Sequence, residues 1–213
     1  MTHVVAARTA IDEVTLESIV QAVRSGELVV IPTDTSYAVI CDAFHASAVT
    51  SLRLAKGQNS DVSLPIGASS LQTINGVARL STLAIDVVNS FWPGALTLLT
   101  PAQDSLSWNI GSRDNALAVR VPHHEIALQI LGAIGPVVMT GAQQASAKPV
   151  VTIEEAQASL GDTVSYYVDG GSLSGATSSV LDATSDSLRL VREGAVTLAQ
   201  LREIAPMIVK ATS

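Results

Sequence analysis

The sequence predicts an α/β fold, with one domain over residues 1–213 built on a twisted sheet of mixed parallel and antiparallel strands and flanking helices. First, the apolar run at 28–31 is typical of a strand buried on both faces. Second, helical and strand-like patterns alternate along the chain. Third, strand-like runs at 164–168, 179–182 and 188–192 lie too close together for helical crossovers, so some strands must pair antiparallel.

The elements follow in order from residue spacing. Thr15 can cap a helix with apolar residues on one face, and Gly26 would end that helix. The strand at 28–31 comes next. A second helix is predicted over 46–55, so Lys56 would project from a helix end or from the loop beyond it.

The rest of the chain continues the alternation. Trp92-Pro93-Gly94 breaks a helix, Thr152 with Glu155 forms a capping box, and so does Thr197 with Gln200. The further elements are a strand at 62–68, a helix at 81–91, strands at 95–100 and 116–121, a helix at 123–131 and a strand at 137–140.

Composition narrows the class of protein. Charged residues make up 15% of the chain and the net charge is −7, so we expect weak or no direct nucleic acid binding. Cys41 is the single cysteine, which excludes an internal disulfide, and no Cys/His spacing predicts a metal site. No signal peptide or membrane-spanning run is evident, which predicts a cytoplasmic protein.

The stretch PTDTSYAV follows the buried strand and gathers small polar groups in Thr33, Asp34, Thr35 and Tyr37. Open α/β sheets place ligands at strand ends, which predicts a concave ligand cleft here. The alternative is a turn in which Asp34 and the hydroxyls close local backbone hydrogen bonds.

Three cationic side chains are candidate ligand contacts. Arg120 lies in an apolar strand, where burial requires an anionic ligand or a structural ion pair. Arg192 has the same two interpretations. Lys56 at a helix end is either a ligand contact or a solvated partner of the helix dipole. The pair His123-His124 indicates a helix start rather than a metal site.

Several motifs in one order resemble the YrdC-like family of threonylcarbamoyl-AMP synthases over about residues 15–205. PTDTSYAV is similar to that family's PTDTxYGL, and FWPGALTLL to its FWPGPLTL. ALAVRVPHH, GATSSVLD and LVREGAV are similar to LAVRVPxH, GxxSTVVD and ILRxGAI. The resemblance implies the YrdC-like fold and synthesis of threonylcarbamoyl-adenylate from L-threonine, bicarbonate and ATP, with Mg²⁺ on the triphosphate. The product would serve tRNA modification, with tRNA-modification proteins as partners.

The resemblance also assigns site residues. Lys56 and Arg120 would be catalytic. Substrate would be bound by Thr33, Thr35 and Tyr37. The nucleotide would be bound by Lys56, Thr140, Ala142, Gln143, Ser178 and Arg192.

Departures from the family pattern fall in two segments, KGQNSDVSL and TGAQQASAKP, where the family has KxRPxxxPL and TSANxSG. The changed positions are Gln58, Ser63, Gly141, Gln143 and Ala145. They favour an alternative, a diverged paralogue that binds nucleotide or RNA in the same cleft without making the adenylate. An interaction protein without a small ligand is a third class. The sequence leaves open whether enzymatic activity is full, weak or lost.

Overall fold

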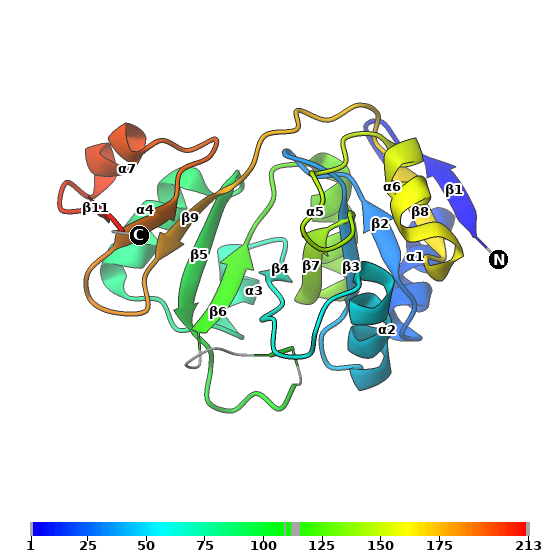
Figure 1. Ribbon diagram of the computed structural model, residues 1–213, viewed down its shortest axis with the longest axis horizontal. Helices are drawn as coiled ribbons and strands as arrows, with labels where there is room; N and C mark the ends of the chain where they lie inside the picture. Colours follow the sequence, from blue (N-terminus) through cyan, green and yellow to red (C-terminus); the bar gives the residue numbers. More distant parts are fainter. Residues whose placement is uncertain (1, 109, 112–115, 212–213) are drawn as a thin grey trace.

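A single mixed sheet runs through the computed structural model, which describes residues 2–108, 110–111 and 116–211 (Figure 1). The strand order is β1-β8-β2-β3-β7-β4-β6-β5-β9-β10-β11, with parallel and antiparallel pairs interspersed. This confirms the predicted fold class. The strands are β1 (His3–Ala6), β2 (Val29–Ile31), β3 (Ala38–Asp42), β4 (Ile66–Gly67), β5 (Leu96–Pro101), β6 (Ala116–Arg120), β7 (Val137–Gly141), β8 (Tyr166–Asp169), β9 (Ser179–Asp182), β10 (Arg189–Arg192) and β11 (Val209–Lys210).

The helices start at polar caps. Both predicted capping boxes, at Thr152 and Thr197, are confirmed. The prediction for the first helix was one turn late, because the Asp12 side chain, not Thr15, is the cap and accepts the Thr15 N–H. The helices are α1 (Glu13–Arg24), α2 (Ala46–Lys56), α3 (Leu71–Asn75), α4 (Thr82–Phe91), α5 (Glu125–Ile134), α6 (Ile153–Leu160) and α7 (Leu198–Ile204), with a 3₁₀ turn η1 (Gly161–Thr163).

The strand predicted at 62–68 shrinks to Ile66–Gly67. The Leu64 N–H bonds to the carbonyl of Ile110 at 2.9 Å instead of joining a ladder, and Pro65 has no N–H to offer. Strands β1, β3 and β11 and helix α3 were not predicted. The predicted helix start at the histidine pair is confirmed, since α5 begins directly after His124.

Helices cover both faces of the half of the sheet that contains β2, β3, β7 and β8 (Figure 1). Val29 and Ile31 of β2 join the apolar cluster beneath α1 and α5, whereas Val30, between them, joins the cluster beneath α2 and α6. This alternation is what a strand buried on both faces requires. The predicted two-sided burial of this strand is therefore confirmed.

The other half of the sheet has one open face. In β5, Leu96 and Leu98 point into the core shared with α4, whereas Thr97 and Leu99 line a pocket on the opposite face. In β6, Val119 points into the same core and Arg120 lines the pocket. Period-two alternation thus places polar and apolar residues of the same strands on different faces. The open face is where the candidate site lies.

Candidate functional site

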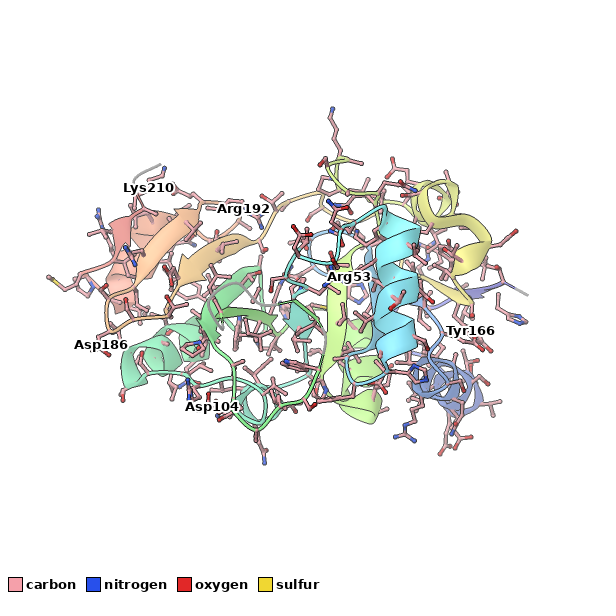
Figure 2. The ribbon with its side chains drawn as sticks, turned by 60° about the horizontal axis from the view of Figure 1, so that its bottom comes forward. Arg53, Asp104, Tyr166, Asp186, Arg192 and Lys210 are labelled. Carbon is pink, nitrogen blue, oxygen red and sulfur yellow. The ribbon has the colours of Figure 1, made fainter. Side chains whose placement is uncertain are left out.

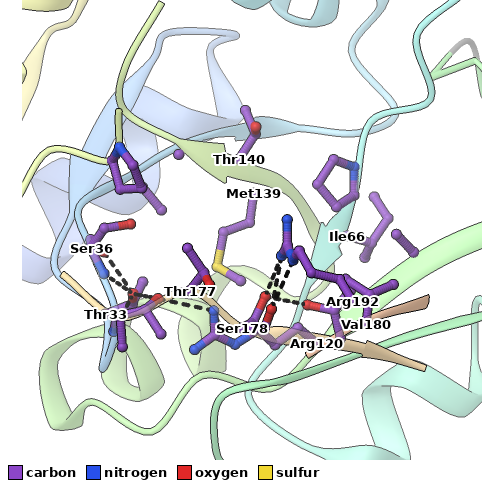
Figure 3. A pocket seen from close by; sticks show the side chains of 18 of the residues that line it. Thr33, Ser36, Ile66, Arg120, Met139, Thr140, Thr177, Ser178, Val180 and Arg192 are labelled. Atoms are coloured by element: carbon purple, nitrogen blue, oxygen red, sulfur yellow. Dashed lines mark hydrogen bonds between the residues drawn. The ribbon is translucent and has the colours of Figure 1, made fainter. Parts of the chain in front are cut away.

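A pocket of about 380 Å³ lies over the middle of the sheet (Figure 3). It is built from the loop between β2 and β3, the strands on either side of β4, and the segment that leads into β9. Its polar lining residues are Thr33, Thr35, Ser36, Ser63, Thr97, Arg120, Thr140, Gln143, Thr177, Ser178 and Arg192. Its volume is within the range of small-molecule sites, roughly 300–1,000 Å³.

The loop between β2 and β3 is ordered by its own hydroxyl groups. The Thr33 hydroxyl donates to the carbonyl of Ser36 at 2.6 Å and accepts the Thr35 N–H at 3.2 Å. This is the local turn that the sequence offered as the alternative to a ligand site. Thr33 and Thr35 nevertheless line the pocket, so the turn and the pocket wall are the same structure.

A salt bridge joins this loop to β6. The Arg120 Nη2 atom lies 2.6 Å from the Asp34 carboxylate, which also accepts the His123 N–H at 3.0 Å. Arg120 further donates to the Thr35 hydroxyl at 3.1 Å and to the carbonyl of Gly94 at 3.0 Å. Burial lowers the pKa of the Arg120 guanidinium, and Asp34 offsets part of that effect. The structure therefore contains the ion pair that was one of the two interpretations of Arg120. Arg120 lines the pocket, and the Asp34 carboxylate compensates its positive charge.

Arg192 is the second arginine of the pocket (Figures 2 and 3). Its guanidinium donates to the carbonyl of Ser178 at 2.9 and 3.1 Å and to the Ser178 hydroxyl at 3.2 Å. Within the described ranges it forms no salt bridge. Ser178 in turn shares a hydrogen bond of 3.0 Å with the Thr97 hydroxyl. Arg192 is thus a cation held only by neutral groups, which leaves its charge available to an anion.

Lys56 does not line the pocket, which corrects its predicted placement there. Its side chain is 3% exposed, and the ammonium donates to the carbonyls of Gly141 and Gln143, the latter at 2.5 Å. Burial lowers the pKa of this ammonium to about 8. The lysine therefore braces the pocket wall formed by Gly141 and Gln143 from behind.

Tyr37 and Ala142 also lie outside the pocket lining, which corrects the expected placement of both. The Tyr37 ring is fully buried, and its hydroxyl donates to the carbonyl of Gly171 at 2.7 Å. Burial raises the pKa of this hydroxyl to about 12. Ala142 is buried behind the wall and donates its N–H to the carbonyl of Tyr37 at 2.9 Å. Both residues therefore shape the pocket from within the core.

Of the remaining predicted residues, Thr140, Gln143 and Ser178 line the pocket. Gln143 folds back over Gly141, because a Cβ added at Gly141 would lie 2.3 Å from the Gln143 Oε1 atom. That oxygen is buried without a hydrogen-bond partner. The two departures from the family pattern are therefore sterically coupled: the glycine makes room for the longer amide.

Of the other three positions that differ from the family pattern, one lines the pocket and two lie outside it. Ser63 lines the pocket and donates to the carbonyl of Gly111 at 3.2 Å, whereas Gln58 and Ala145 lie outside the lining. Lys148, the lysine of the TGAQQASAKP segment, is exposed and outside the lining as well.

Four polar lining residues, Ser36, Ser63, Thr97 and Thr177, were not predicted as site residues from the sequence. A signal existed for Thr97, because it is the polar member of an apolar strand and alternation puts it opposite Leu96 and Leu98. Ser36 and Thr177 lie in loops, where no periodicity reveals the direction of a side chain.

No group of three or more His, Cys, Asp or Glu side chains is placed to hold a metal ion in the described ranges. No helix there is both long and apolar enough to cross a membrane.

A family model named Sua5/YciO/YrdC, described as "Telomere recombination", matches residues 21–194. The chain belongs to this family. A curated family relative from Mycobacterium tuberculosis, named "Putative threonylcarbamoyl-AMP synthase", is 36% identical over 189 residues, which cover 88% of this chain and 87% of the relative. The threonylcarbamoyl-AMP synthase of Bacillus subtilis is 33% identical over 85% of this chain and 54% of its own length.

Solved structures of the family agree with the fold. Sua5 of Pyrococcus abyssi in complex with L-threonine has a TM-score of 0.91 and is 27% identical, covering 99% of this chain and 63% of that one. Escherichia coli YciO has a TM-score of 0.84 at 21% identity, covering 92% and 97% of the two chains, and shows the fold alone. The predicted resemblance to the YrdC-like family is therefore confirmed.

The buried Lys56 ammonium predicts a pH-dependent stability. An unfolded lysine keeps its proton up to about pH 10.5, whereas the folded Lys56 releases it near pH 8, so the folded state binds fewer protons between these values. The free energy of unfolding should therefore rise with pH across this window, by about 1–2 kcal/mol from pH 7 to pH 9.5. Urea unfolding of wild type and Lys56→Met at both pH values measures this rise, which the variant should lack.

The exposed Lys148→Met variant is the matched control for that comparison and should keep the wild-type pH dependence. Identical pH dependence in wild type and Lys56→Met would show that the Lys56 ammonium is not desolvated.

The contact between Gly141 and Gln143 predicts a non-additive pair of substitutions. Gly141→Ser alone displaces the flexible end of the Gln143 side chain and should lower the free energy of unfolding by about 0.5–1.5 kcal/mol, the cost of a strained rotamer. Gly141→Ser combined with Gln143→Asn removes the clash and should recover most of the loss. Urea unfolding of both single variants and the double variant tests this. A Gly141→Ser variant as stable as the double variant would contradict the packing.

Proposed function

We propose that this chain makes threonylcarbamoyl-AMP from L-threonine, bicarbonate and ATP, with release of pyrophosphate, for modification of a tRNA adenosine in the cytoplasm. The observation that carries the proposal is that residues from four separate motifs line one pocket, namely Thr33 and Thr35, Arg120, Ser178 and Arg192. Family membership supports it, as do the relatives named threonylcarbamoyl-AMP synthase and the threonine-bound Sua5 structure.

In this reaction the threonine amine captures bicarbonate as a carbamate, with loss of water. A carbamate oxygen then attacks the α-phosphate of ATP, and the bond to the pyrophosphate leaving group breaks. The described lining residues include no Cys, His, Lys, Asp or Glu, so they would act by positioning and by charge stabilisation. Arg192 would face the charge that develops on the α-phosphate, and the hydroxyls of the loop between β2 and β3 would orient threonine.

Mg²⁺ would enter with ATP, bound to its phosphate oxygens. The described lining residues offer no carboxylate to hold the ion themselves. The nucleotide alone would therefore hold the ion.

A second candidate function is a paralogue that binds nucleotide in the same pocket without making the adenylate. It is favoured by the placement of Lys56, whose ammonium donates to the wall carbonyls, and by the Gln143 amide folded over Gly141. Both features leave fewer ammonium and amide N–H groups that could donate a hydrogen bond to a triphosphate in the pocket.

Pyrophosphate release by the purified chain tests the proposed reaction. We expect slow release that requires threonine, bicarbonate and ATP together. Arg192→Ala should lower the rate roughly 10–100-fold, the value of one charge-assisted hydrogen bond to phosphate. The triple variant Gln58→Arg, Gly141→Ser, Gln143→Asn should raise it, because it returns three changed positions to the family's pattern.

Arg189→Ala is the matched control, since Arg189 lies on the same strand but pairs with Asp182 at 3.6 Å and does not line the pocket. It should leave the rate unchanged. Nucleotide binding without threonine-dependent pyrophosphate release would establish the paralogue instead. Absence of both binding and release would contradict either function.

A further inference from the structure

Arg53 is a buried arginine on helix α2 that lies outside the pocket lining (Figure 2). Only 8% of the residue is exposed. Burial lowers the pKa of its guanidinium, and the carboxylate of Asp61 opposes part of that effect. Burying a charged group costs free energy, which hydrogen bonds must offset. The hydrogen bonds that Arg53 makes therefore indicate what it is buried for.

The Arg53 guanidinium joins two segments that are far apart in the sequence. Its Nη1 atom donates to the carbonyl of Asn59 at 2.8 Å, and its Nη2 atom donates to the carbonyl of Ile110 at 2.9 Å. The planar guanidinium reaches both oxygens at once, because its N–H groups form a rigid fork. Two hydrogen bonds from one cation therefore tie the segment after α2 to the segment between β5 and β6.

The two segments also contact each other at the edge of the pocket. The Leu64 N–H donates to the carbonyl of Ile110 at 2.9 Å, and the Ser63 hydroxyl donates to the carbonyl of Gly111 at 3.2 Å. A Cβ added at Gly111 would lie 3.1 Å from the Arg53 Nη2 atom, so the guanidinium packs closely against this junction. Ser63 lines the pocket. The packing around Arg53 therefore determines where this part of the wall lies.

This part of the wall is separate from the loop that we propose orients threonine. Ser63 and Pro65 line the pocket just before β4, and strands β7 and β3 lie between β4 and β2 in the sheet. Thr33 and Thr35, whose hydroxyls would orient threonine, follow β2. A shift of Ser63 and Pro65 would therefore change the part of the pocket that is left for the nucleotide.

We propose that Arg53 is a positioning residue for nucleotide binding, which acts from outside the pocket by holding the carbonyls of Asn59 and Ile110. Its two hydrogen bonds keep Ser63 and the residues around it in place on the wall. This inference rests on the proposed function and names a residue that affects nucleotide affinity without touching the ligand.

Lys56 supports another part of the wall from the same helix. It lies three residues after Arg53, so the two side chains are neighbours on the surface of α2. Its ammonium donates to the carbonyls of Gly141 and Gln143, which both line the pocket. The last turn of α2 therefore supports the pocket at two places, each time through a buried cation that binds backbone carbonyls.

Arg53→Met removes the donors and keeps an unbranched apolar side chain. Isothermal titration of the full chain with ATP and Mg²⁺, and separately with threonine, measures the effect on each ligand. We expect ATP to bind about tenfold more weakly, the value of one hydrogen bond, and threonine to bind as in wild type. Arg53→Lys keeps the charge without the fork and should weaken ATP about threefold. Amide hydrogen exchange should rise at 58–64 and 110–111 in Arg53→Met.

Arg202→Met is the matched control. Arg202, on α7, also donates to a backbone carbonyl, that of Ile208 at 2.9 Å, and lies outside the pocket lining. Its loss should leave ATP and threonine binding unchanged.

Three results would overturn the inference. Wild-type ATP affinity in Arg53→Met, or in Arg53→Lys should the methionine variant not fold, would show that the nucleotide does not depend on Arg53. Equal weakening of ATP and threonine would show a general loosening of the fold instead of positioning. Both results would leave the proposed function standing. A wild-type chain that binds no ATP would overturn the proposed function and this inference with it.

Discussion

The salt bridge between Asp34 and Arg120 is the contact on which the pocket depends. Its two side chains come from the loop between β2 and β3 and from the end of β6, which lie on different halves of the sheet. Both side chains are largely buried, at 17% and 10% exposed, so each requires the other as a counter-charge. The pair therefore joins the loop between β2 and β3 to the end of β6 across the pocket.

The same pair decides what the pocket can recognise. Asp34 neutralises Arg120, whereas Arg192 has no acidic partner among the described residues and its guanidinium is held by Ser178. Lys56 adds a positive charge behind the wall and no direct donor. Hydroxyl groups make up most of the remaining polar lining. A site of this kind works by orienting its ligands rather than by supplying a nucleophile.

Much of the fold follows from local patterns that act over a few residues. The two capping boxes, the helix break at Trp92 and the buried strand before Pro32 are each specified by neighbouring side chains. Strand β3 was missed because its apolar run directly follows the motif loop, without a turn signal of its own. The order of strands in the sheet depends on long-range pairings that periodicity does not encode.

The site was predicted only in part, for a related reason. The resemblance to the family's motifs identified Thr33, Arg120, Ser178 and Arg192, and Arg120 also carries a chemical signal of its own, as an arginine in an apolar strand. It could not show that Lys56 and Tyr37 turn away from the pocket, since their direction is set by partners distant in sequence, the carbonyls of Gly141 and Gly171. The fit of Gln143 over Gly141 is likewise visible only in three dimensions.

A double-mutant cycle on Asp34 and Arg120 tests most directly whether their ion pair holds the two sides of the pocket together. The free energy of unfolding is measured by urea denaturation for wild type, Asp34→Asn, Arg120→Met and the double variant. The account predicts strong coupling: each single variant strands a largely buried charge, so the double variant loses about 1–3 kcal/mol less than the sum of the singles. Effects that add to within about 0.5 kcal/mol would contradict it.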